Sequence, residues 1–162
     1  MEFKDLDIAI NAMQENDLID ITNIERESYD FPWNKSIFKD CLFLSGYKCF
    51  TAKNQGIIIG YAILSIVMDE AHVLNVCIGK KFRKLGFGDK LLDYLVIESQ
   101  HAGVKKIFLE VRSSNKKAIA LYCKKGFEQI AKRPSYYRHF NGREDAEVFV
   151  LNMGKIGYID IQ

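Results

Sequence analysis

A basic, glycine-containing loop between an apolar strand and a long helix is the segment of this sequence best suited to chemistry. It follows Val76–Ile78 and contains Arg83, Lys84, Gly86 and Gly88. Glycines without a Cβ let a ligand approach the backbone closely, and the free N–H groups of a first helical turn favour anions. Together with the two basic side chains, this arrangement suits a diphosphate. The spacing is neither that of a Walker loop nor that of a dinucleotide-binding fingerprint, so a solvated basic connection is an equal alternative.

Two ionisable side chains, Glu110 and Tyr122, stand in apolar stretches further along the chain. Glu110 interrupts the nearly continuous apolar run 105–111, where a carboxylate is costly unless it is paired or used. Tyr122 lies two helical turns after Asn115, so both side chains can face the same side of a helix. Each has an ordinary alternative. Glu110 can pair with Arg112 or another cation, or point to solvent, and Tyr122 can be a core residue with its hydroxyl satisfied.

Apolar periodicity and turn signals predict seven strands and four helices in the order β-α-α-β-β-β-α-β-α-β-β. The alternation in the second half implies right-handed β-α-β crossovers, and the first half is a meander. The predicted fold class is therefore α/β (α+β), with a mixed, mostly antiparallel central sheet of about seven strands and helices on both faces. The predicted strands cover residues 7–13, 47–53, 57–67, 71–78, 105–111, 127–133 and 145–153, and the predicted helices cover 16–29, 34–43, 87–102 and 115–125.

A few polar residues and glycines are expected to set the ends of these elements. Asn16 and Asn34 are predicted to cap the first two helices, and Gly103 to end the third. Residues 54–56, Asn-Gln-Gly, are predicted to form a hairpin-type turn. The residues between the last two strands, 134–144, are predicted to form an aromatic and polar loop.

Length and composition bound the class of protein. The 162 residues suffice for one core and are too few for two, so we expect a single domain over residues 1–162. The formal net charge of +2 gives no strong field toward nucleic acid or membranes. Four cysteines without a CxxC pair and three widely separated histidines predict reduced thiols and no structural metal site. The charged N-terminus and the lack of an apolar run of roughly 18 residues favour a cytoplasmic protein.

Three motifs together resemble the GNAT (Gcn5-related N-acetyltransferase) superfamily. The first is Arg-x-x-Gly-x-Gly at 83–88, the second is Leu-Glu-Val-Arg-x-x-Asn at 109–115, and the third is Ala-x-x-Leu-Tyr-x-x-x-Gly-Phe at 118–127. The resemblance covers roughly residues 7–153, and the predicted order of elements matches a GNAT-like fold. It implies an enzyme that uses acetyl-CoA as a co-substrate and needs no metal.

Shorter stretches narrow the resemblance to the ribosomal-protein-alanine N-acetyltransferases within that superfamily. They are Phe-Pro-Trp at 31–33, Asp-Glu-Ala at 69–71, and Gly-Arg-Glu-Asp-Ala at 142–146, which follows the pair Tyr136-Tyr137. The implied acceptor, and the implied partner, is the N-terminal alanine of protein eighteen of the small ribosomal subunit. We expect no direct contact with nucleic acid or membrane, and a monomer or weak dimer.

The resemblance assigns roles to matching positions. Glu110 matches the family's proton acceptor, and Tyr122 matches its proton donor. The implied cofactor-binding residues are Val76, Cys77 and Ile78 along the acetyl and pantetheine arm, Arg83, Lys84, Leu85, Gly86, Phe87, Gly88 and Asp89 around the pyrophosphate, and Asn115. The candidate acceptor-binding residues, for which ordinary packing is the alternative, are Phe31, Trp33, Tyr136 and Tyr137.

The identity of the acceptor stays open between several amines. At pH 7 roughly a tenth of an α-amine is neutral, against well under a thousandth of a lysine side chain, which favours α-amine substrates. One alternative is a GNAT acetyltransferase for a polyamine, a lysine side chain or a small-molecule amine such as an antibiotic. Another is a non-catalytic module that binds CoA or docks on a ribosome, against which the presence of both Glu110 and Tyr122 argues. A small basic nucleic-acid module is a third, and the charge of +2 argues against it.

Overall fold

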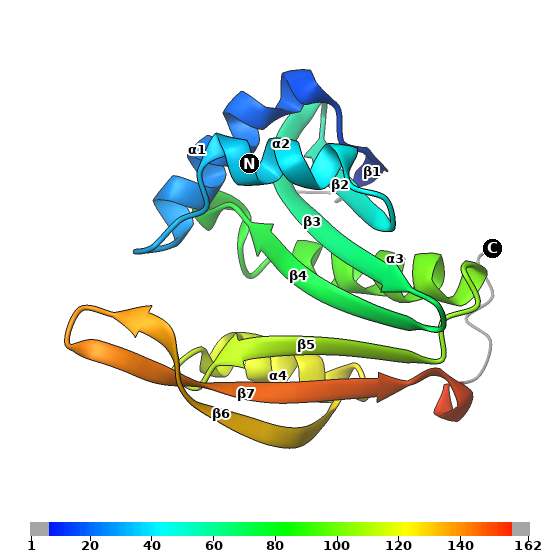
Figure 1. Cartoon of the computed structure of the whole chain (residues 1–162). Coiled ribbons are helices and arrows are strands. Elements are labelled where there is room, and N and C mark those ends of the chain that lie inside the picture. The colour runs from blue at the N-terminus through cyan, green and yellow to red at the C-terminus, as the bar shows by residue number, and fades with distance from the viewer. Residues whose placement is uncertain (1–6, 157–162) are drawn as a thin grey trace. The chain divides into compact units, whose positions relative to one another are not determined.

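The computed structural model describes residues 7–156, which form a mixed α/β fold (Figure 1). Seven strands within this range are hydrogen-bonded in the order β1-β2-β3-β4-β5-β7-β6. The pairs β1–β2, β2–β3, β5–β7 and β6–β7 are antiparallel, and β4–β5 is parallel. The predicted fold class and element order are confirmed, with short 3₁₀-helices in addition. The strands are β1 (Ala9–Ala12), β2 (Tyr47–Asn54), β3 (Ile57–Val67), β4 (Glu70–Ile78), β5 (Lys106–Arg112), β6 (Glu128–His139) and β7 (Gly142–Asn152), and the helices are η1 (Glu15–Asp17), α1 (Leu18–Ser28), α2 (Lys35–Phe43), η2 (Lys80–Phe82), α3 (Phe87–His101), α4 (Lys116–Lys124) and η3 (Met153–Lys155).

The described chain packs as two compact units. The first comprises the residues up to Ser65 together with Leu74–Val96, and the second comprises Ile66–Val73 together with the residues from Ile97 onward. Strands β3 and β4 and helix α3 therefore contribute residues to both units. The single domain over residues 1–162 stays a prediction.

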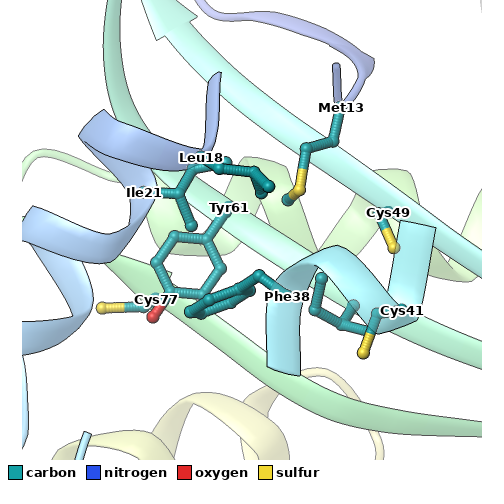
Figure 2. Close-up of a cluster of buried hydrophobic side chains, with 9 residues drawn as sticks. Met13, Leu18, Ile21, Phe38, Cys41, Cys49, Tyr61 and Cys77 are labelled. Atoms are coloured by element: carbon teal, nitrogen blue, oxygen red, sulfur yellow. The ribbon is translucent and has the colours of Figure 1, made fainter. Parts of the chain in front are cut away.

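The core of the first unit lies between helices α1 and α2 and strands β2 and β3. Tyr61 stands at its centre, between Ile21 of α1 and Phe38 of α2 (Figure 2). The rings of Phe38 and Tyr61 meet edge to face with centroids 5.3 Å apart, a favoured geometry for aromatic pairs. Cys49 is buried in the same cluster, and desolvation raises the pKa of its thiol to about 12. This apolar cluster holds both helices against the strands.

Alternation along β2 and β3 sends side chains to both faces of this part of the sheet. Cys49 and Ile63 are register partners on the face that α1 and α2 cover, and Phe50 and Ala62 are partners on the other face. The Phe50 ring contacts Tyr94 of α3 edge to face, with centroids 5.2 Å apart. Strands covered on both faces are apolar nearly throughout, which explains the composition of β3.

The N-termini of α1 and α2 are formed differently. Asn34 accepts a hydrogen bond from the backbone N–H of Ile37 at 3.0 Å, so its predicted role as the cap of α2 is confirmed. The prediction that Asn16 caps the first helix is wrong, because Asn16 lies inside η1 and Asp17 precedes α1. The Asp17 carboxylate accepts a hydrogen bond from the backbone N–H of Gln14 at 2.8 Å, and this bond starts the turn before Asn16 is reached.

In the second unit, β5, β7 and β6 form one layer with α4 packed against it (Figure 1). Strand β5 pairs with β7 along its whole length, Lys106–Arg112, and with β4 along Glu70–Val73. Helix α4 is held by aromatic contacts, since the ring centroid of Tyr122 lies 5.8 Å from that of Phe127 and 6.4 Å from that of Phe149. These contacts fix the buried face of α4 against β7.

The prediction of a loop over residues 134–144 is wrong, because most of this segment is strand. Strand β6 continues to His139 and β7 begins at Gly142, and the two strands form a long hairpin. Strand β6 lies at the edge of the sheet and carries Pro134 and mostly exposed side chains. Such an edge strand lacks the alternating apolar pattern by which buried strands are recognised.

A bulge in β6 redirects its aromatic side chains. The register with β7 shifts between Arg133 and Tyr137, and Ser135 within the shift has a φ of 52°. The backbone N–H of Ser135 donates to the Asp145 carboxylate at 2.9 Å. Tyr136 and Tyr137 follow directly, and their rings meet edge to face with centroids 4.9 Å apart. The bulge thus sets the direction of both phenols.

Phe38→Ala should destabilise the first unit strongly. Phe38 is fully buried, so the truncation leaves a cavity in a close-packed cluster, at a typical cost of about 3–5 kcal/mol. Phe43→Ala on the same helix is the control, because Phe43 is 70% exposed and its loss should cost less than about 0.5 kcal/mol. Urea unfolding followed by circular dichroism measures both variants. Equal losses would contradict this assignment of the core.

Candidate active site

Glu110 lies on β5, and two residues of β6 hold its carboxylate. The Nε of Arg133 lies 3.0 Å from Glu110 Oε1. The hydroxyl of Tyr136 donates to the same carboxylate, and this hydrogen bond, with burial and the nearby negative charge, raises the pKa of Tyr136 above its ordinary value. The side chain of Glu110 is 27% exposed and that of Arg133 is 55% exposed, so water screens the ion pair and weakens it. A competing cation, such as an ammonium group, can therefore take the place of the guanidinium.

Tyr137 packs against Tyr136 on the Glu110 side of the sheet. Burial raises the pKa of its phenol, and the neighbouring Glu110 and Tyr122 add to the shift. The guanidinium of Arg112 acts in the opposite direction from its position over the Tyr137 ring, 4.6 Å from the centroid. The register places Glu110 and Tyr122 on opposite faces of the sheet, because Tyr122 packs on Phe149, the partner of Leu109, whereas Glu110 is the partner of Val148.

Arg112 fastens the β6–β7 hairpin to β5. Its Nη1 donates to Glu144 Oε1 at 2.8 Å and to the backbone carbonyl of Arg138 at 2.7 Å. Burial alone would raise the pKa of Glu144, but hydrogen bonds from Arg112 and Ser114 hold that pKa below its ordinary value. The hairpin that carries the two tyrosines is therefore anchored by a half-buried ion pair.

Helix α4 positions Asn115 and Tyr122. Asn115 is the N-cap, and its Oδ1 accepts a hydrogen bond from the backbone N–H of Ala118 at 3.2 Å, so a contact with a cofactor would use its Nδ2. Tyr122 is 7% exposed, and its ring packs against Phe127 and Phe149. A ring held in this way keeps its hydroxyl in one place, as a positioned proton donor requires.

In the first unit, the predicted phosphate loop connects the end of β4 to α3. Strand β4 ends at Ile78, and the N–H of Gly79 donates to the carbonyl of Ile59 on β3 at 2.8 Å. Arg83 folds back, since its Nε donates to the carbonyl of Ile78 at 2.8 Å and its Nη2 lies 4.0 Å from Cys77 Sγ. The guanidinium thus stabilises the end of the strand, beside the backbone predicted to meet the acetyl arm.

The remaining residues of this loop divide into exposed backbone and buried anchors. Lys84 and Gly86 have positive φ angles, 63° and 85°, and a Cβ at Gly86 would meet nothing within 4 Å. The backbone conformation therefore explains this glycine, and the space beside it is open. Phe87 is 2% exposed, so it anchors the start of α3 and can offer a ligand only its backbone. The partly buried residues of the same turn are Leu85, Gly88 and Asp89.

Phe31 and Trp33 lie on the connection between α1 and α2, where both are partly buried. The backbone N–H of Trp33 donates to the Glu25 carboxylate at 2.9 Å. On the same connection, the hydroxyl of Tyr29 donates to the backbone carbonyl of Val76 at 3.3 Å. The connection is thus fastened to α1 and to the strand that precedes the phosphate loop.

Sequence reasoning missed the contacts of three residues that shape these sites. Arg133 is the cation that pairs with Glu110, and Glu25 and Tyr29 fasten the α1–α2 connection. The contacts of Arg133 and Tyr29 join segments far apart in the chain, so local spacing could not reveal them. Glu25 did leave a signal, because it occupies a position of α1 that an amphipathic helix otherwise fills with an apolar residue.

The two units offer different chemistry. The second presents a partly exposed carboxylate, that of Glu110, bonded to the phenol of Tyr136, which suits proton transfer. The first presents a basic, glycine-containing turn at a helix start, which suits an anion. Among residues 7–156, no group of three or more His, Cys, Asp or Glu side chains could hold a metal ion. Within the same range, no helix is long and apolar enough to cross a membrane.

Fold, motifs and side chains together define an acetyltransferase. The model of the Acetyltransferase (GNAT) family matches residues 18–127, more than half of the chain, and the chain belongs to this family. It is an N-acetyltransferase enzyme, as its relatives also indicate. The predicted resemblance to the GNAT superfamily is thereby confirmed.

Individual relatives of the chain carry more specific names than the family. The chain is 34% identical over 143 residues to the ribosomal protein bS18-alanine N-acetyltransferase of Escherichia coli (strain K12). The aligned region covers 88% of this chain and 96% of that protein. The crystal structure of the ribosomal-protein-S18-alanine N-acetyltransferase from Escherichia coli is similar, with a TM-score of 0.86, 32% identity, and 96% and 99% of the two chains covered. The crystal structure of Arabidopsis thaliana NAA60 in complex with acetyl-CoA has the same fold, with a TM-score of 0.80 at 18% identity over 91% and 99% of the chains.

Glu144→Gln should weaken the second unit in a pH-dependent way. The folded carboxylate has a lowered pKa, so its stabilisation is present above the unfolded value of roughly 4.3 and is lost as the pH falls through the folded value. We expect a loss of about 1 kcal/mol at pH 7 that shrinks below about pH 4, measured by urea unfolding. Glu128→Gln is the control, because that side chain is 61% exposed. A difference that stays constant over the pH range would contradict the role of the Arg112–Glu144 pair.

Proposed function

We propose that this chain transfers the acetyl group of acetyl-CoA to the N-terminal alanine of ribosomal protein bS18. The observation that carries the proposal is the likeness to the Escherichia coli bS18-alanine N-acetyltransferase over nearly the whole of both chains. The stretches 31–33 and 142–146, which resemble the same branch, support the same acceptor, because acetyltransferases that share the cofactor half differ in the acceptor half. The reaction then belongs in the cytoplasm, where both substrates occur, and its partner is a protein N-terminus.

Acetyl-CoA would bind at the end of β4 and the start of α3. The backbone of Val76, Cys77 and Ile78 would meet the acetyl and pantetheine arm. The pyrophosphate would lie on the turn around Gly86, where the space is open and the first N–H groups of α3 favour an anion. Lys84, exposed in the same turn, adds positive charge. The residues present therefore fit the co-substrate.

Glu110 would act as the proton acceptor. The acceptor arrives as an ammonium ion, and the partly exposed Glu110–Arg133 pair allows that ion to replace the guanidinium. Proton transfer to Glu110 frees the nitrogen lone pair, which attacks the thioester carbonyl carbon, so that a C–N bond forms and the C–S bond breaks. The hydroxyl of Tyr136, already bonded to Glu110, would hold the carboxylate in place during this exchange.

Tyr122 would donate a proton to the departing sulfur. As the intermediate collapses, the nitrogen loses its second proton to water. The products are then an N-acetylated peptide, the free thiol of CoA and one released proton, with Glu110 protonated and Tyr122 deprotonated. Exchange with water restores both groups. The buried, packed ring of Tyr122 supports this role, because a proton donor has to be held at a constant distance from the leaving atom.

A panel of acceptors tests the proposed function. A peptide beginning Ala-Arg-Tyr, an N-terminally blocked peptide with a free lysine, and spermidine are each mixed with acetyl-CoA, and thiol release is followed. We expect the fastest release with the free alanine, which should gain one acetyl group by mass spectrometry. Faster turnover of either other amine would assign a different acceptor. No thiol release with any amine would indicate a binding module instead of an enzyme for these amines.

Glu110→Gln should reduce turnover of the alanine peptide far more at pH 7 than at pH 9. Glutamine keeps the shape of the side chain but cannot take a proton, and a general base typically contributes about 10²–10⁴-fold. At pH 9 most of an α-amine with a pKa near 8 is already neutral, so the base matters less. We expect about a 100-fold loss of kcat/KM at pH 7 and less than about 10-fold at pH 9.

The control for this comparison is Arg133→Gln, which removes the ion pair and keeps the base. Its kcat/KM should not show the same dependence on pH. A defect in Glu110→Gln of equal size at both pH values would count against Glu110 as the proton acceptor.

Tyr122→Phe should lower turnover without weakening acetyl-CoA binding. The substitution removes only the hydroxyl and keeps the ring against Phe127 and Phe149. We expect kcat to fall by about 10-fold or more, while the dissociation constant for acetyl-CoA, measured by calorimetry, stays within about twofold. Tyr94→Phe removes a phenol that packs on Phe50 and serves as the control, with unchanged kcat. A Tyr122→Phe enzyme with full turnover would remove this residue from the mechanism.

A further inference from the structure

Glu25 is the most deeply buried carboxylate among residues 7–156, at 2% exposure. It lies on α1, on the side of the helix that faces the strands. A carboxylate withdrawn from water is costly unless donors compensate it, and the proposed proton transfers do not use this one. Its place in the first unit therefore calls for another explanation.

Donors from three separate segments converge on Glu25. The backbone N–H of Trp33 donates to Oε1 at 2.9 Å, the hydroxyl of Tyr61 donates to Oε2, and Nδ2 of Asn75 donates to Oε2 at 3.2 Å. Trp33 belongs to the α1–α2 connection, Tyr61 to β3 and Asn75 to β4. Desolvation raises the pKa of Tyr61 well above its ordinary value, so its phenol stays protonated and remains a donor.

A further hydrogen bond joins the α1–α2 connection directly to β4. Tyr29, at the start of the α1–α2 connection, donates its hydroxyl to the carbonyl of Val76 at 3.3 Å. Asn75 and Val76 are neighbours at the end of β4, where the acetyl arm would bind. The connection that carries Phe31 and Trp33 is thus tied twice to the strand that would receive the acetyl group.

We propose that Glu25 is a positioning residue for the acceptor: its carboxylate holds the α1–α2 connection in register with β4, so that the acceptor amine meets the acetyl group in attacking geometry. The inference rests on the proposed function. Glu25 touches neither reactant and acts through Trp33 and Asn75. Such positioning matters because a displacement of about 1 Å can cost a large part of the rate.

Two variants separate positioning from simple support of the fold. Glu25→Gln can keep one oxygen as an acceptor for Trp33, but its amide places donors opposite the donors of Tyr61 and Asn75. Asn75→Ala removes the tie to β4 and leaves the other two hydrogen bonds. The control is Ile63→Val, which loosens the packing of the same buried cluster without removing any hydrogen bond to Glu25.

Trp33 is the only tryptophan of the chain, so its fluorescence reports on the connection without any substrate. We expect acrylamide to quench this fluorescence about twofold faster in Glu25→Gln and Asn75→Ala than in the wild type or Ile63→Val. With the alanine peptide, the acceptor KM of both variants should rise about tenfold, while the KM for acetyl-CoA stays within about twofold.

Faster quenching together with a higher acceptor KM supports the proposal. Unchanged quenching, or an unchanged acceptor KM with no more than the kcat loss of Ile63→Val, overturns it. If Glu25→Gln does not fold, Asn75→Ala decides by the same two measurements. A wild-type protein that fails to acetylate the alanine peptide would refute the proposed function and, with it, the acceptor role of Glu25, while the quenching would still show whether Glu25 holds the connection.

Discussion

A carboxylate withdrawn from water has to receive hydrogen bonds, and both units of this chain are organised by that requirement. In the first unit, the Glu25 carboxylate accepts hydrogen bonds from donors in three segments. In the second unit, the requirement is met at Glu144 by Arg112 and at Glu110 by Arg133. The degree of burial separates their roles. Glu25 is 2% exposed with both oxygens engaged, whereas Glu110 is 27% exposed and holds a pair that water can loosen.

The bulge in β6 links the stability of the hairpin to the chemistry beside it. In a regular strand, neighbouring residues such as Tyr136 and Tyr137 point to opposite faces. Here the register with β7 shifts around Ser135. Tyr136 is bonded to the Glu110 carboxylate, and the charge of Glu110 contributes to the raised pKa of Tyr137. An edge strand with an irregular register is therefore what surrounds the candidate proton acceptor with phenols.

The sequence was most informative where one local rule dominated. The cap of α2 at Asn34 and the turn between β2 and β3 follow from side-chain and glycine chemistry within a few residues. The errors arose where local signals competed or were weak. Asn16 does not cap the first helix because η1 begins before it, with the Asp17 carboxylate bonded to the N–H of Gln14. Residues 134–144 were predicted as loop because an exposed edge strand with a proline has no apolar period.

Motif spacing and apolar periodicity are properties of neighbouring residues, so they were enough to identify the family, the order of elements, and the candidates Glu110 and Tyr122. The groups that contact these candidates could be identified only from the folded chain. Arg133 reaches Glu110 from another strand, and Glu25 gathers donors from three segments, since hydrogen bonds across a sheet depend on strand order and register. Neither strand order nor register is encoded by a local sequence pattern.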